Sequence, residues 1–328
     1  VIGAVDGENL MLFNWVMAVL SILSNLLLVL LVNKVKVVDL GSYTVLIYVS
    51  AVMDVIIAMS KALVVPVNIH MGKYSFVVFG VGTWRWPAFP GLVSIYVFDL
   101  LFYQTFCILC YHFVYRYMVL QRTSSFVAEL NIWHWTAMGI IFEIICNVIM
   151  TFFISHYEPR TDWRPDAQLV NDMFNYYGIN MSRPFGHFHV VYAEVDEEDG
   201  SMAWNWPIVI YTLSILGLIY MLGGTDFSLV LQNPFKIIAN TSELIVFSVL
   251  MLVSFTPVGG LVLLPLTGSQ FGALGNYLMS ITAVYPAWDP LLLIFCIQRS
   301  YRRQIYAWFE CLIPFSYRRI SKVNSMSQ

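Results

Sequence analysis

The stretch YPAWDPLLLIFCIQRSYRRQI, residues 285–305, decides how the rest of the chain is interpreted. It opens with an apolar run that holds one acid, Asp289, directly followed by Pro290, and it closes with three arginines. A proline inside a membrane-length helix leaves a carbonyl of the preceding turn unpaired, which neighbouring helices or water must satisfy. An acid at membrane depth faces a protein interior or a water-filled cavity. The stretch therefore predicts the last spanning helix of a bundle with a polar interior, followed by a basic cytoplasmic tail.

The composition is that of an integral membrane protein. Hydrophobic residues make up 59% of the 328 residues and charged residues 11%, against about 25% charged residues in soluble domains. The first apolar run carries no charge and is interpreted as an uncleaved signal anchor. Seven runs are long enough to cross about 30 Å of hydrocarbon, which predicts an all-α seven-transmembrane helix bundle: 10–32, 43–66, 92–119, 133–154, 203–223, 244–266 and 271–297.

Lysine and arginine set the orientation. With the N-terminus outside, eleven of these residues fall in inner segments and five in outer segments, which favours a cytoplasmic C-terminus. We expect an extracellular N-terminus (1–9), a receptor domain (10–298) and a cytoplasmic tail (299–328). The loop after the fourth span is then extracellular and acidic, and its sequon predicts a glycan on Asn180, whereas the sequon at Asn240 is cytoplasmic and stays bare.

The tail and the cysteines point to membrane lipid rather than to disulfides. Apolar residues recur on one helical face from Tyr301 to Leu312, which predicts a short amphipathic helix on the inner leaflet, with its arginines near anionic headgroups. Cys311 is interpreted either as a palmitoylation site or as a plain buried cysteine. The other cysteines lie in apolar runs, so no disulfide framework is predicted.

The sequence contains no pattern of an enzyme. It has no GxSxG, HExxH or glycine-rich phosphate loop, so no enzymatic activity, cofactor or nucleic-acid partner is expected. His187 and His189 have the spacing of a metal-binding pair, but no third ligand is evident. We interpret them as two exposed loop histidines and expect no metal site.

Charged and polar residues inside the spans predict a switch core, made of Asn25, Asp54, Asp289 and Pro290. Two acids that lie close together do not both ionise, so a proton, a cation or a water cluster is expected between them. A purely structural polar cluster is the alternative. Arg116, at the inner end of the third span, is either an interfacial anchor or a contact for a cytoplasmic partner.

Lys61 and Asp99 are predicted at one depth near the outer side. Span two runs outward and Lys61 precedes Pro66 by five residues, whereas span three runs inward and Asp99 follows Leu92 by seven. At 1.5 Å per residue both lie about 8–10 Å below the outer edge, where opposite charges are expected to pair. Either the pair is purely structural or it lines an apolar ligand cavity together with Tyr96, Phe102, Tyr103 and Gln104.

The chain resembles the nematode seven-transmembrane chemosensory receptors, most closely serpentine receptor class r (str). The resemblance rests on SNLLLVLLV (24–32), HMGKYSFVVFG (70–80), CYHFVYRYMVL (110–120), NYYGIN (175–180) and the stretch at 285–305. It implies a G-protein-coupled olfactory-type receptor for a volatile or soluble odorant or pheromone. It also implies a heterotrimeric G protein as partner and the ciliary plasma membrane of chemosensory neurons as location. Tyr115, Arg116 and Tyr117 are then the expected coupling residues.

The sequence departs from the rhodopsin-like pattern at several positions. Tyr115 stands where an acid usually precedes Arg116, Leu293 stands where a tyrosine is expected, and no cysteine in the outer loop can join it to span three. Two other classes stay open. One is an odorant-gated seven-helix cation channel of inverted topology, which the charge count opposes, and the other is a structural or transport protein without a ligand switch.

Overall fold

A computed structural model gives the fold. It describes a set of ranges separated by gaps, namely 7–35, 43–71, 74–121, 132–155, 170, 174–175, 185–195, 200–214, 216–217, 256, 259–269, 274–294 and 304–306.

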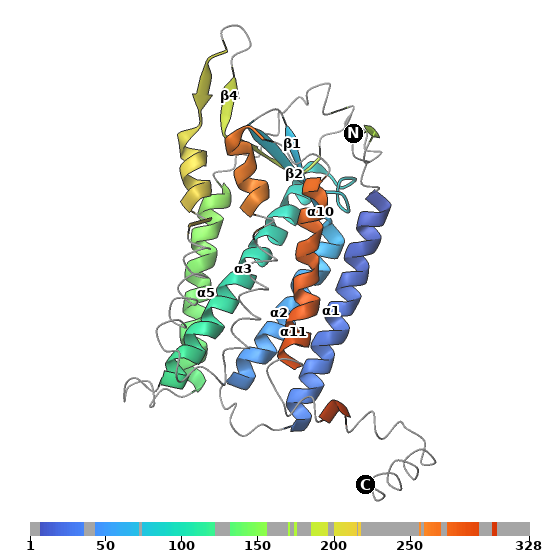
Figure 1. The fold of residues 1–328 in the computed structure, drawn as a ribbon, viewed down its shortest axis with the longest axis vertical. Helices are drawn as coiled ribbons and strands as arrows, with labels where there is room; N and C mark the ends of the chain where they lie inside the picture. Colours follow the sequence, from blue (N-terminus) through green and yellow to red (C-terminus); the bar gives the residue numbers. More distant parts are fainter. Residues whose placement is uncertain are drawn as a thin grey trace, which may run out of the picture.

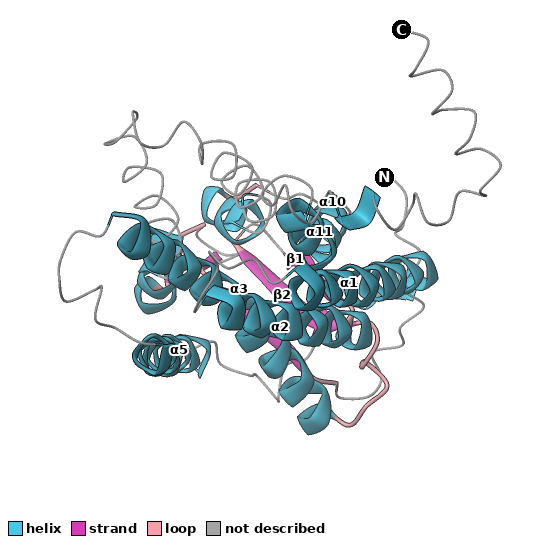
Figure 2. Cartoon of the chain, turned by 90° about the horizontal axis from the view of Figure 1, so that it is seen from below, coloured by secondary structure: helices cyan, strands magenta, loops and turns pink. Residues whose placement is uncertain are grey.

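Long helices form a bundle whose interior combines apolar side chains with small and polar ones. The helices α1 and α2 pack along each other, α11 packs on both, and α3 packs between α2 and α5 (Figures 1 and 2). Of the described helices, Gly7–Val35 and Thr44–Val64 are long and apolar enough to cross a membrane, and Trp133–Ile149 is a shorter apolar one. The bounds are α1 Gly7–Val35, α2 Tyr43–Val64, α3 Ala88–Gln121 and α5 Ile132–Ser155.

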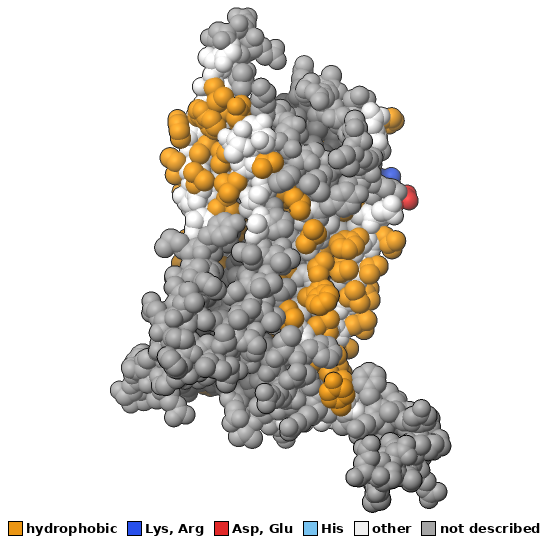
Figure 3. Space-filling view, viewed as in Figure 1, with side chains coloured by type: hydrophobic (Ala, Val, Ile, Leu, Met, Phe, Trp, Pro, Cys, Tyr) orange, Lys and Arg blue, Asp and Glu red, His pale blue; other side chains and the backbone are white. Residues whose placement is uncertain are grey.

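Unlike a surface helix of a soluble protein, the helix α1 buries polar side chains and exposes large apolar ones. Its buried face carries Asn14, Ser21 and Asn25, whereas large apolar side chains such as Leu12 and Leu23 are more than half exposed. Apolar side chains accordingly cover the flank of the molecule along α1 (Figure 3). An apolar outer surface around a polar interior suits a lipid solvent, because lipid tails leave polar groups unsatisfied.

The seventh predicted span is a helix with a 3-10 segment in its middle. It consists of α10 (Leu274–Ile281), the 3-10 turn η3 (Thr282–Val284) and α11 (Tyr285–Leu292). Pro286 follows the turn and lacks the N–H that would bond to the carbonyl of Thr282, so the tighter winding occurs where α-helical pairing fails. Pro290 lies inside α11.

Strands close the end of the bundle at which α1 begins. A three-stranded antiparallel sheet, which we call the cap, has the order β1-β2-β3 and consists of β1 Pro66–Met71, β2 Ser75–Gly80 and β3 His187–Val191. Beside it, β4 Ala193–Val195 and β5 Met202–Trp204 pair with each other. Most of the described residues of the predicted spans are helical. The segments that form these strands are loops or helix ends in the prediction from sequence.

The cap is joined to the helices by two tight connections. The helix α2 is followed by Val65, a buried residue with a positive φ of 49°, whose N–H bonds to the carbonyl of Lys61 at 2.8 Å. A β-branched residue in this conformation is strained, and it reverses the chain directly into β1. On the other side, a Cβ on Gly186 would lie 2.0 Å from the backbone nitrogen of Leu92. Only glycine therefore lets β3 approach the start of α3 this closely.

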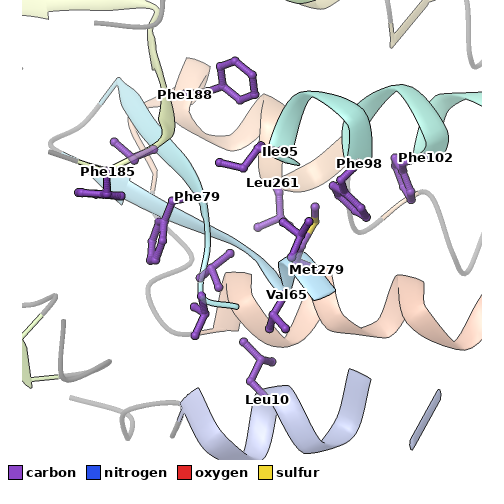
Figure 4. Packing of buried hydrophobic residues seen from close by; sticks show 14 residues of the cluster. Leu10, Val65, Phe79, Ile95, Phe98, Phe102, Phe185, Phe188, Leu261 and Met279 are labelled. Atoms are coloured by element: carbon purple, nitrogen blue, oxygen red, sulfur yellow. The ribbon is translucent and has the colours of Figure 1, made fainter. Parts of the chain in front are cut away.

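A single apolar cluster fills the space between the cap and the bundle, and we call it the subcap cluster. Phe79, Phe185 and Phe188 come from the cap side, and Phe98 and Phe102 come from α3 (Figure 4). Its fully described members are Leu10, Val64, Val65, Val67, Val77, Phe79, Val81, Ile95, Phe98, Phe102, Phe185, Phe188, Leu261 and Met279.

Several sequence expectations need correction or lie outside the described ranges. The fifth span was predicted from Ala203, but Met202–Trp204 is β5 and the helix begins at 206. Half of the sixth span, and all of the tail apart from 304–306, lie outside the described residues. Residues 304–306 are helical, with Ile305 buried and Tyr306 exposed. Cys107 and Cys146 are free thiols that hydrogen-bond across α3 and α5.

Candidate ligand site and switch core

The carbonyl of Pro286 is the junction of α1 with the seventh span. Pro290, four residues later, has no N–H to give it. Instead it accepts a hydrogen bond from Ser21 Oγ at 3.1 Å and another from Asn25 Nδ2 at 3.1 Å. The neighbouring helix thus satisfies the carbonyl that the proline frees, as the sequence predicts. Asn25 Nδ2 also donates to the backbone oxygen of Ser21 at 2.9 Å, which fixes its amide against α1.

Two buried acids lie beside this junction. Asp54 of α2 and Asp289 of α11 are 5% and 8% exposed, and their carboxyl groups are close enough for their charges to interact. The phenol of Tyr285 lies within electrostatic reach of both. The structure therefore brings together the four residues of the predicted switch core. Sequence reasoning missed Ser21 and Tyr285, because a lone serine or tyrosine in an apolar run carries no signal of its partner.

Lys61 lies on the same face of α2, nearer the cap, and is 3% exposed. Its ammonium donates to the carbonyl of Met279 at 2.8 Å and to Thr282 Oγ1, at the point where α10 passes into η3. Thr282 Oγ1 itself donates to the Met279 carbonyl at 2.7 Å, so its lone pairs face the ammonium. Among the described contacts Lys61 forms no ion pair with Asp99, and the pairing that the sequence suggested is replaced by these neutral acceptors.

The other predicted ligand residues lie along the half of α3 that is nearer the cap. The Tyr96 hydroxyl donates to the Thr151 carbonyl of α5 at 3.1 Å, and its ring centroid lies 5.9 Å from that of Phe188 in the cap. Phe102 stacks on Phe98 at 6.0 Å between centroids, and Tyr103 packs edge-on against Phe102 at 6.1 Å.

Three of the predicted residues share one apolar environment next to Lys61. Phe102 belongs to the subcap cluster, and Tyr96 and Tyr103 pack against it. Met279 connects the two groups, because its side chain is in the cluster and its carbonyl holds Lys61. Asp99 and Gln104 are half-buried on α3, and neither forms a described hydrogen bond with this group.

His187 departs from the sequence interpretation. It was interpreted as an exposed loop histidine, but it lies in β3, is 9% exposed, and its ring is 4.9 Å from that of Phe185. His187 Nδ1 lies 2.9 Å from the Phe185 carbonyl. Burial lowers the pKa of His187, and this hydrogen bond opposes the shift in part. Within the described ranges no three metal-ligating side chains come together.

The remaining predicted sites are only partly described. Tyr115, Arg116 and Tyr117 have helical backbone in α3, but their side chains lie outside the described part of the chain. Asn180, the expected glycosylation site, also lies outside it.

Comparison with protein families gives a match that extends over most of the chain. The model of the family described as "Serpentine type 7TM GPCR chemoreceptor Str" matches residues 10–250 and 244–306. No protein in the curated set matches the chain.

Proposed function

We propose that this chain detects a small volatile or soluble cue and signals through a heterotrimeric G protein. The chain belongs to the serpentine type 7TM GPCR chemoreceptor Str family. The family makes it a multi-pass membrane receptor of chemosensory type. Our proposal adds the position of the ligand, the route of the signal and the orientation in the membrane.

In the proposed orientation the cap faces outward. The excess of lysine and arginine on the inner segments supports it, and α1 begins beside the cap, where Gly7 approaches Val81. The ligand then binds beneath the cap, between Lys61 and the aromatic side chains of α3. The proposed location is the plasma membrane, in particular the ciliary membrane of chemosensory neurons, as in the resemblance noted above.

The observation that carries the proposal is the continuity between the two sites along the seventh span. Lys61 holds this span at Met279 and Thr282, and four residues further on α1 holds it at Pro286. Between these points lies the 3-10 turn, where the helix is wound differently. A ligand that displaces Lys61 from Thr282 therefore acts on the hinge that the switch core controls.

Signal transfer follows from the charges of the switch core. Two neighbouring buried carboxyl groups favour a shared proton, because burying two negative charges together is costly. A shift of α11 changes the distance between Asp54 and Asp289. It therefore changes whether the two carboxyl groups favour sharing one proton. The inner end of α3, with Tyr115, Arg116 and Tyr117, then meets the G protein.

The test is a ligand screen in cells that express the receptor. A panel of volatiles is applied with and without a blocker of G-protein coupling, while second messengers and membrane current are recorded. We expect responses that the blocker abolishes. A ligand-evoked cation current that persists under the blocker would instead support the channel of inverted topology.

A further inference from the structure

The ammonium of Lys61 is a buried positive charge whose acceptors are both neutral. It is 3% exposed, and its hydrogen-bond acceptors are the Met279 carbonyl and the Thr282 hydroxyl oxygen. An ammonium has three N–H donors, so within the described structure one donor and the whole charge lack a matching partner. Asp99, the acid that the sequence places at this depth, is not in hydrogen-bonding contact with it.

Such an arrangement is costly unless something else compensates the charge. A buried ammonium loses several kcal/mol of hydration, and carbonyl dipoles recover only part of it. The strongest compensation is an anion that accepts a charge-assisted hydrogen bond. Because Lys61 is held by a residue of the subcap cluster, the remainder of that anion is expected to be apolar.

One of the two acceptors of the ammonium belongs to a residue of the apolar subcap cluster. Met279, which holds Lys61 through its carbonyl, points its side chain into the subcap cluster, where Leu261 and Phe98 lie close to it (Figure 4). Small-molecule sites combine such an apolar wall with few polar anchors. A molecule with an acid group and a hydrocarbon tail matches both the ammonium and the apolar side chains of this cluster.

We propose that the ligand of this receptor is a small organic acid, whose carboxylate binds the ammonium of Lys61 and whose hydrocarbon tail packs in the subcap cluster beneath the cap. This inference rests on the proposed function and adds the chemical class of the ligand. In binding, the carboxylate takes the free N–H of Lys61 and competes with Thr282 for a second one, which loosens the 3-10 turn.

The experiment compares head groups at constant chain length. Straight-chain carboxylic acids of four to ten carbons (about the size that a few aromatic side chains can enclose) are tested beside the alcohol, methyl ketone and amine of the same length. Two readouts are taken from the full-length receptor, namely G-protein activation in cells and thermal unfolding of the purified protein. Each is measured for wild type, Lys61→Gln and Lys61→Arg.

We expect the acids to activate and stabilise the wild type more strongly than their matched alcohols. Lys61→Gln should lower the potency of acids about 10- to 100-fold, the range of one charged hydrogen bond, and should lower it more than the potency of the matched alcohols. Lys61→Arg should restore most of the potency. Leu63→Ala, on an exposed face of the same helix, serves as the control and should leave the response to acids as in wild type.

Several outcomes would overturn the inference. Equal effects of acids and alcohols on the wild type, or a stronger effect of amines, would contradict it even if Lys61→Gln fails to reach the surface. A response to neutral volatiles alone would remove the anion site and leave the receptor function standing. Stabilisation by acids without G-protein activation would support the anion site but contradict the proposed receptor function.

Discussion

At the scale of single residues, one carbonyl couples α1 to the seventh span. Pro290 removes the intrahelical partner of the Pro286 oxygen, and Ser21 and Asn25 take its place. A buried acceptor that loses its donors costs about 1–3 kcal/mol. These two side chains therefore hold the hinge of the span in one position.

Asn25→Ala should lower the free energy of unfolding by about 1–3 kcal/mol, measured by thermal unfolding of the purified receptor in detergent. Ser24→Ala is the matched control, because Ser24 is also buried, at 6% exposed against 2% for Asn25, and its described hydrogen bond goes to the Ser21 carbonyl of its own helix, at 3.1 Å. We expect the control to cost less. Equal losses would mean that the bond to Pro286 contributes nothing of its own.

The same junction can be tested by restoring the missing N–H. In a Pro290→Ala background the backbone can donate to the Pro286 oxygen again, so Asn25→Ala should cost less than it does in the wild type. A double-mutant cycle measures this coupling, which we expect at about 1 kcal/mol. Additive effects of the two substitutions would contradict the account.

His187 gives the cap a dependence on pH. Because burial lowers its pKa in the folded protein, the unfolded chain takes up a proton first, near pH 6.5. Stability should therefore be full above this pH and fall as the medium is acidified below it, by at most about 1.4 kcal/mol per pH unit for one proton. His187→Phe should remove this part of the dependence. An unchanged profile of thermal unfolding against pH would show that another group is responsible.

At this scale the sequence predicted the switch core but not the partners of Lys61. It predicted that the proline would free a carbonyl and that Asn25, Asp54 and Asp289 would meet, because polar groups at membrane depth have few alternatives. It placed Lys61 at the correct end of α2 but gave it an acid as partner. The true acceptors are a backbone carbonyl and a threonine, and neither stands out in an apolar sequence.

At the scale of elements, the cap is the feature that the sequence did not reveal. The residues of β1 were divided between the end of the second span and a loop, since strands in short connections lack the long alternation that identifies them. The third strand, β3, comes from a distant loop, and its pairing with β2 depends on the helices that bring both strands together. The bounds of α1, α2, α3 and α5 were predicted to within a few residues, because the length of an apolar run indicates them.

The contact of Gly186 with α3 gives this element its test. A methyl group there would meet backbone atoms, which cannot move aside as a side chain can. We expect Gly186→Ala to destabilise the receptor by about 3 kcal/mol, the upper part of the usual range for overpacking, and to lower surface expression. Gly217→Ala is the control, because no atom lies within 4 Å of the added carbon. Similar stability of both variants would contradict the described position of β3.

At the scale of the whole molecule, the orientation in the membrane is the main proposal. The cap and the start of α1 lie at one end of the bundle (Figure 1), and the distribution of charge places that end outside. We expect a glycan on Asn180 and none on Asn240, detected as a shift in gel mobility. Asn180→Gln should remove the shift, and Asn240→Gln should keep it. A glycan on Asn240 alone would invert the bundle and favour the channel.

The most direct test of the central claim is ligand-stimulated nucleotide exchange in membranes that contain the receptor and a heterotrimeric G protein. Binding of a non-hydrolysable GTP analogue is measured with the active compounds of the screen, for wild type and for Arg116→Ala at equal surface expression. We predict that the ligand accelerates exchange for the wild type and that Arg116→Ala loses this acceleration while it still binds the ligand. A ligand that binds and opens a cation current without any change in nucleotide exchange would contradict the account.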